Sequence, residues 1–190
     1  MRELSTFKLI DRITTLLRSE ERKRYLAMGL QPIHVQILEY LAQCNRLSDT
    51  PAAVTEYFGL TKGTVSQSLQ VLERKGYIEK TANPLDRRIL HLNLSPEGHD
   101  LLDEILGINM LPHACKTLND DQFEEINKAL NKALIALQAA NNLRSFGVCH
   151  TCKKMSEVDN HYLCELTQEP LSQDDTKKIC REHVLTDSAD

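Results

Sequence analysis

The spacing of the apolar residues changes along this chain, and that change restricts the fold more than any other feature. Up to Gly76 the apolar residues recur at three- and four-residue steps, which is typical of amphipathic helices. After Gly76 comes a turn at residues 83–86 and then an alternating stretch at residues 89–94, which is typical of a β-hairpin. A helical period returns after Pro96. The sequence therefore predicts a mainly α, α+β domain with one small hairpin.

Two short helices before the hairpin are indicated by their end signals. Thr50 is an N-cap followed by Pro51 in the first turn, and Gly59 is placed to end this helix. Thr61 caps the next helix, and Gly76 follows its last turn. Two short helices joined by about three residues around a glycine form a helix-turn-helix. A hairpin directly after it makes the predicted unit a winged helix-turn-helix.

The second of these helices has an unusual outward face. If Val65, Leu69 and Leu72 face the core, a rotation of about 100° per residue turns the other side toward solvent. That side carries Gly63, Thr64, Ser66, Gln67, Gln70 and Arg74. Hydroxyl and amide groups suit contact with base edges, and glutamine can bind adenine through two hydrogen bonds. An ordinary solvated polar face is the alternative. Lys62 and the free amides near Thr61 are predicted to contact phosphate.

The charge is divided unevenly along the chain. The whole sequence has a formal charge of −4, but residues 61–91 hold 6 Lys and Arg against 3 Asp and Glu. Residues 92–190 hold 9 against 17, so this part would be repelled by a polyanion. Binding to DNA, if present, is expected in the central segment.

The central block DTPAAVTEYFGLTKGTVSQSLQVLERKGYIEK, followed by NPLDRRILHLNLSPEG, resembles the MarR family of bacterial transcription regulators. The resemblance covers roughly residues 4–142, and its most specific part is Asp86-Arg87-Arg88 followed by residues 94–98. It implies a winged helix-turn-helix that binds a double-stranded DNA operator. It also implies that Arg87 enters the minor groove and that Asp86 sets its direction. Arg88 is expected either to contact phosphate or to lie solvated along the strand.

The helices on both sides of the DNA-binding domain are expected to form a homodimer, as the resemblance implies. The helix that begins near Leu4 and the helix whose stripe runs from Phe123 to Leu137 carry apolar residues that are poorly suited to water. Packing of the two stripes within one chain is the alternative. A two-fold dimer would bind an inverted repeat with half-sites about 10 base pairs apart. The predicted organisation is a dimerisation helix at 1–30, the DNA-binding domain at 31–94 and dimerisation helices at 95–146. A cysteine-rich extension at 147–185 and a disordered tail at 186–190 follow.

The extension contains four of the six cysteines of the chain. Cys149 and Cys152 form a C-x-x-C turn, Cys180 and His183 have the same spacing, and Cys164 lies between them. The extension has few apolar residues, and a metal could supply its folding energy. Zinc bound by the four cysteines, with His183 as an outer partner or replacement ligand, is the simplest prediction. An iron–sulfur cluster and metal-free thiols remain open. A cluster or oxidisable thiols would make the extension a redox or metal sensor.

Other functional classes are less well supported. The C-x-x-C turn follows a long helix rather than a strand of a βαβ unit, which disfavours a thiol oxidoreductase. No H-E-x-x-H or deaminase motif occurs, so no enzyme is predicted. A zinc-stabilised protein-interaction module is a further alternative, and a small-molecule effector stays open. No apolar stretch approaches membrane-helix length, and Asp11 and Arg12 interrupt any signal sequence, so a cytoplasmic location is expected. His34 and His91 are interpreted as ordinary polar residues.

Overall fold

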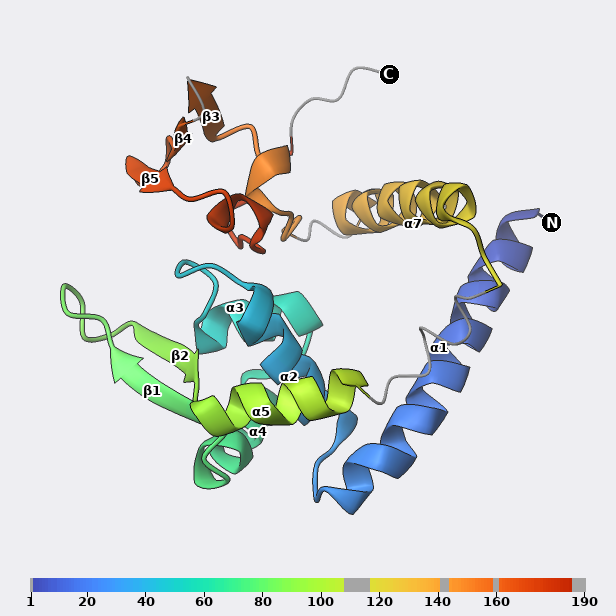
Figure 1. The fold of residues 1–190 in the computed structure, drawn as a ribbon, viewed down its shortest axis with the longest axis horizontal. Coiled ribbons are helices and arrows are strands. Elements are labelled where there is room, and N and C mark those ends of the chain that lie inside the picture. Colours follow the sequence, from blue (N-terminus) through green and yellow to red (C-terminus); the bar gives the residue numbers. More distant parts are fainter. Residues whose placement is uncertain (1, 108–116, 141–143, 159–160, 186–190) are drawn as a thin grey trace.

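A computed structural model of the chain describes residues 2–107, 117–140, 144–158 and 161–185 (Figure 1). The helices are α1 (Arg2–Ala27), α2 (Pro32–Gln43), α3 (Pro51–Phe58), α4 (Lys62–Arg74), α5 (Pro96–Gly107) and α7 (Asp120–Ala140), with short 3-10 turns η1 (Cys149–Thr151) and η2 (Asp175–Lys177). The strands are β1 (Ile78–Ala82), β2 (Leu90–Leu94), β3 (Met155–Val158), β4 (His161–Cys164) and β5 (Glu169–Leu171). The predicted fold class, mainly helical with a hairpin wing, is confirmed. The predicted disordered segment at 186–190 lies outside the described residues.

Helices α3 and α4 form the helix-turn-helix, and local caps determine where they begin and end. The Thr50 and Thr61 hydroxyls accept hydrogen bonds from the amides of Ala53 and Thr64, both at 3.2 Å. These bonds satisfy amides that have no partner within the helix. Gly59 has a φ of 62°, a left-handed conformation that glycine adopts without strain. The end signals in the sequence therefore predicted this motif correctly.

The hydrophobic core lies beneath α4. Val65, Leu69 and Leu72 are buried and belong to one cluster with apolar residues of α2, α3, β1, β2 and α5. Each fully buried aliphatic side chain of this kind stabilises the fold by about 1.5–3 kcal/mol relative to exposure. The core therefore determines which side of α4 faces outward.

The wing is an antiparallel hairpin in which Ile78 pairs with Leu94 and Ala82 with Leu90. At its base the Ser95 hydroxyl donates to the Gly76 carbonyl at 2.5 Å and accepts from the Gly98 amide at 3.0 Å. Ser95 thus joins the end of β2 to the start of α5 and to Gly76, two residues before β1. Both the hairpin and the restart of a helix at Pro96 agree with the sequence prediction.

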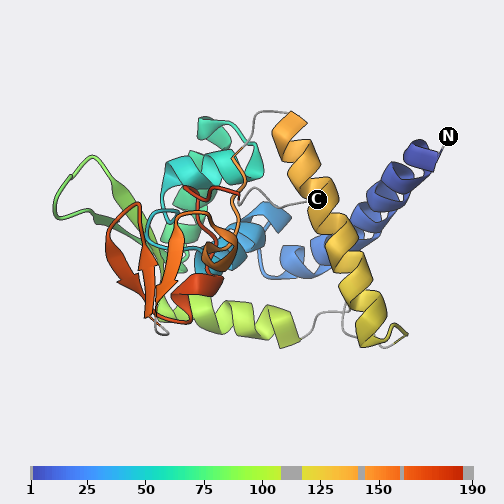
Figure 2. The same ribbon diagram turned by 90° about the horizontal axis from the view of Figure 1, so that it is seen from above.

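Helices α1 and α7 extend from the winged helix on the side away from the wing (Figures 1 and 2). Their apolar stripes are exposed: Leu9 is 61%, Ile13 56%, Leu130 49% and Leu134 52% accessible. Packing of the stripes against each other within the chain, the alternative considered above, is therefore not what the structure shows. Among the residues described, no helix combines the length and apolar composition that a membrane crossing requires.

The cysteine-rich extension contains a three-stranded antiparallel sheet in the order β3-β4-β5. These strands were not predicted, because each is only three or four residues long and shows no clear pattern of alternation. The extension lies against the winged helix, where Ile179 bridges to Cys44 after α2 and to Val148. Gly147 passes so close to the His183 ring that a Cβ atom there would overlap it. The extension is therefore packed onto the DNA-binding domain as well as joined to it.

Candidate DNA-binding surface and cysteine pocket

The outward face of α4 is open to solvent. Its exposed members are Thr61, Lys62, Gly63, Thr64, Ser66, Gln67, Gln70 and Arg74. The Thr61 and Thr64 hydroxyls lie 3.0 Å apart and bond to each other, whereas Ser68 is buried and its hydroxyl donates to the Thr64 carbonyl. Within the described part of the chain, Ser66, Gln67 and Gln70 have no side-chain hydrogen bond. The exposure agrees with the predicted face, and its use in DNA binding stays a prediction.

At the wing tip, Asp86 holds Arg88 rather than Arg87. The Arg88 guanidinium donates from Nε to Oδ1 at 2.9 Å and from Nη2 to Oδ2 at 2.8 Å. The Arg88 amide also donates to Asp86 Oδ1 at 3.0 Å. The prediction that Asp86 orients Arg87 was wrong, because the turn places the residue two positions after the carboxylate in its reach. The Arg88 hydrogen bonds lower the pKa of Asp86, so the carboxylate stays charged. Arg87 is exposed.

The wing is supported from below by a buried pair that sequence reasoning missed. His91 on β2 and Asp49 before α3 have side chains only 7% exposed, and His91 Nδ1 lies 2.5 Å from Asp49 Oδ1. The other ring nitrogen of His91 lies 3.0 Å from Asn83 Nδ2. Asn83 Oδ1 in turn accepts from the amides of Leu85 and Asp86 and shapes the tip. The interpretation of His91 as an ordinary polar residue was wrong, since its partner lies 42 residues away in sequence.

His34 is also more than a surface polar residue. It is buried in the first turn of α2, and its Nδ1 accepts a hydrogen bond from the Gln31 amide at 3.1 Å. Burial and the nearby Lys75 charge lower the pKa of His34, which keeps the ring neutral and able to accept. The only sequence signal for this role was its position three residues after Gln31.

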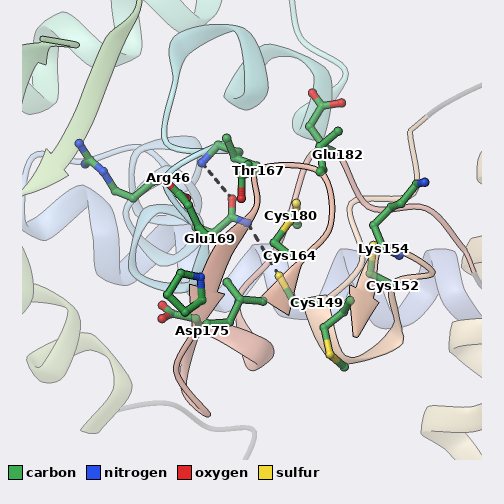
Figure 3. A pocket seen from close by; sticks show the side chains of 16 residues that line it. Arg46, Cys149, Cys152, Lys154, Cys164, Thr167, Glu169, Asp175, Cys180 and Glu182 are labelled. Carbon is green, nitrogen blue, oxygen red and sulfur yellow. Dashed lines mark hydrogen bonds between the residues drawn. The ribbon is translucent and has the colours of Figure 1, made fainter. Parts of the chain in front are cut away.

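A second site is a pocket of about 180 Å³ between the extension and the loop after α2 (Figure 3). Its lining includes Cys149, Cys152, Cys164 and Cys180, so the structure brings the four cysteines to one cavity. The amides of Lys154 and Val184 both donate to Cys152 Sγ at 3.4 Å. The Asn45 side-chain amide lies 3.9 Å from Cys149 Sγ.

Cys149 and Cys180 interact directly in this pocket. A hydrogen bond between the two side chains lowers the pKa of Cys180 and raises the pKa of Cys149. The lowered pKa of Cys180 favours its thiolate, which is the form that binds metal ions.

The side chains are not arranged as a closed metal site. Over the described ranges, no three His, Cys, Asp or Glu side chains converge in a way that could hold a metal ion. His183 lies apart from the pocket lining: its Nδ1 bonds to the Ser145 hydroxyl at 2.7 Å and its Nε2 to the Thr151 hydroxyl at 3.0 Å. Metal binding by the four cysteines would require rotation of thiol side chains, whereas His183 would have to give up both partners.

Comparison with known proteins identifies the family of the winged helix. Residues 28–89 match the model of the MarR family. The transcriptional repressor MprA of Escherichia coli K12 is 27% identical over 133 residues, which cover 67% of this chain and 76% of MprA. The cysteine-rich extension lies outside the residues that match the family model.

Solved structures show the same fold. FabT of Streptococcus pneumoniae, crystallised in complex with DNA, superposes with a TM-score of 0.58 at 21% identity, covering 74% of this chain and 99% of FabT. The transcriptional regulator PA3341 superposes with a TM-score of 0.62 at 23% identity, covering 70% and 98%. The matching proteins are transcription regulators and not enzymes, as expected from the sequence. The winged helix of this chain, over residues 28–89, therefore matches the MarR family of transcriptional regulators.

Proposed function

We propose that this protein is a repressor that binds a specific DNA operator as a homodimer. The observation that carries the proposal is the outward face of α4, where the side chains of Ser66, Gln67 and Gln70 are exposed and bond to none of the other described residues. A helix of this kind fits the major groove, whose base edges offer matching donors and acceptors. MprA, named as a repressor, and FabT, crystallised with DNA, support the same function.

The wing supplies the second DNA contact in this proposal. The Arg88 side chain is 90% exposed, yet its guanidinium is held by both oxygens of Asp86. An arginine already fixed in direction loses less conformational freedom when it enters a narrow groove. We therefore assign to Arg88 the minor-groove role that the sequence had suggested for Arg87.

The exposed stripes of α1 and α7 are proposed to meet those of a second copy of the chain. Four large aliphatic side chains, each about half exposed or more, mark stripes that favour burial. A two-fold dimer would place two α4 helices in successive major grooves and would select an inverted repeat.

Selection of binding sites from randomised duplexes tests the proposal. The expected product is an inverted repeat with half-sites about 10 base pairs apart. Gln67→Ala should relax the preference at one position of each half-site, by about 1–3 kcal/mol, whereas Glu79→Gln on the wing strand serves as an exposed control. If the wild-type protein enriches no particular sequence, the proposal of a specific operator is refuted.

We also propose that the cysteine pocket binds one zinc ion through Cys149, Cys152, Cys164 and Cys180. Four thiols lining one cavity, with amide donors aimed at two of the sulfurs, support this donor set. Thiolates are preferred zinc ligands, and the ion would supply folding energy that the small sheet lacks. Zinc would then have a structural role, whereas an iron–sulfur cluster on the same thiols would make the extension a sensor.

Elemental analysis and the absorption spectrum of protein purified without oxygen separate these cases. One zinc per chain and no visible colour is the expected result, and Cys164→Ser should lower the zinc content while Cys44→Ser should not. Cys44 is a matched control because it is buried outside the pocket lining. Iron with sulfide would identify a cluster, and a metal-free preparation that remains folded would refute the metal site.

A further inference from the structure

The loop between α2 and α3, residues 44–49, contacts the extension on one side and the wing on the other. Ser48 is fully buried and Asp49 is 5% exposed, although the segment belongs to no helix or strand. A connecting loop normally runs over the surface. Burial of polar residues here means that their hydrogen-bonding groups are satisfied by other parts of the protein.

The extension holds the first half of this loop. The Asn45 amide donates to the Ile179 carbonyl at 2.9 Å, and the Ile179 amide donates to the Gln43 carbonyl at 2.8 Å. The Arg181 amide donates to the Ser48 hydroxyl at 2.7 Å, and that hydroxyl donates to Asn45 Oδ1 at 2.7 Å. Arg181 also forms a two-point ion pair with Glu56 on α3. These contacts come from the segment that contains Cys180.

The wing is attached to the second half of the loop. The Leu92 amide donates to the Asp49 carbonyl at 2.7 Å, next to the buried pair of Asp49 with His91. Arg46 bonds to Asp49 at 2.7 Å and to Asn93 Oδ1 at 2.9 Å. Three consecutive residues of β2 are thereby attached to a loop that the extension holds in place.

We propose that this loop couples the extension to the wing, with Ser48 and Asp49 as positioning residues for the DNA-contacting tip. The path runs from the Arg181 amide to Ser48, through the adjacent Asp49 to His91, and from His91 to Asn83, which shapes the turn at Asp86. Loosening of the extension removes the Arg181 amide from the Ser48 hydroxyl and frees the loop that orients β2. The effect on operator binding rests on the proposed function, whereas the mechanical coupling does not.

Amide hydrogen exchange of the full-length protein in the absence of DNA tests the coupling directly. Ser48→Ala removes the acceptor of the Arg181 amide but keeps the backbone of the loop. It should speed exchange at Leu92 and Ile89 in the wing by about 3- to 10-fold, the factor that corresponds to one net hydrogen bond. Lys177→Gln is the matched control, because Lys177 is exposed, pairs with Asp174 inside the extension and makes none of the described contacts to the loop.

Coupling must act in both directions. Asp49→Asn weakens the wing side of the loop and should speed exchange at Ile179 and Arg181 in the extension by a similar factor. This variant carries the test if Ser48→Ala does not fold. Unchanged wing amides in Ser48→Ala, or unchanged extension amides in a folded Asp49→Asn protein, would overturn the coupling.

Operator binding by the same variants separates this inference from the proposed function. Ser48→Ala should weaken specific binding about 3- to 10-fold without altering the base preference set by α4. A wild-type protein that binds no specific DNA refutes the repressor function but leaves the exchange result standing. Wild-type operator binding together with exchange effects confined to the loop refutes only the coupling.

Discussion

Replacement of Arg88 by alanine should reduce operator affinity and its dependence on salt. Each cationic side chain that neutralises a DNA phosphate contributes about 0.9 to the slope of log affinity against log salt concentration. A dimer presents two copies of Arg88, so the slope should fall by about 1.8. A fourfold increase in salt would then cost the wild-type protein about 12-fold more affinity than the variant.

The structure provides a matched variant that separates charge from orientation. Asp86→Asn keeps the guanidinium charge but removes the carboxylate that holds Nε and Nη2 of Arg88. The salt slope should stay at the wild-type value, while affinity falls by about 2- to 10-fold per arginine because an unheld side chain must be ordered on binding. Neither change should alter the thermal stability measurably, since the Asp86–Arg88 pair lies at the surface.

Fluorescence anisotropy titrations of a labelled operator at several salt concentrations measure both quantities, with Arg87→Ala as the comparison. The reasoning fails if Arg88→Ala retains the wild-type slope while Arg87→Ala lowers it. In that case Asp86 would restrain Arg88 although Arg88 does not contact DNA.

Three further predictions concern stability. Gly98→Ala should lower the free energy of urea unfolding by about 1–3 kcal/mol, because the added Cβ would overlap the Tyr77 carbonyl. Gly63→Ala is the control and should not destabilise the protein, since its Cβ would lie 3.8 Å from the nearest atom. Equal stability of the two variants would contradict this prediction. The pKa of His34 is lowered by burial from 6.5, so its contribution to stability is complete above about pH 6.5 and is lost as the pH falls through the folded value; His34→Gln should flatten this slope between about pH 7 and pH 5. The Arg181 hydrogen bond lowers the pKa of Glu56 from 4.5, so docking of the extension should weaken as the pH falls below about 4.5. Protease cleavage after the lysines of the extension should increase over the same pH range. In Glu56→Gln this dependence on pH should be absent.

Much of the winged helix could be predicted from local signals. The Thr50 and Thr61 caps, Gly59 and the spacing of Val65, Leu69 and Leu72 act within one or two helical turns, and all of them have the expected roles. Which face of α4 is exposed follows from the same spacing. These features are readable because helix ends and amphipathic faces depend on residues close together in the chain.

The predictions failed where a contact depends on geometry that spacing does not specify. The turn at the wing tip decides that Asp86 holds Arg88, although Arg87 is its immediate neighbour in sequence. The three short strands of the extension show no clear alternation of apolar and polar residues, and their register is set by their pairing with one another.

The sequence by itself therefore determined the order of helices and hairpin, the exposed face of α4 and the clustering of the cysteines. Each of these features depends on residues that lie close together in the chain. Only the tertiary structure decided that Asp49 meets His91 and that Arg181 meets Ser48. Those pairs are separated by 42 and 133 residues. Buried polar groups must find partners wherever the packed chain brings them, and no local pattern in the sequence specifies that partner.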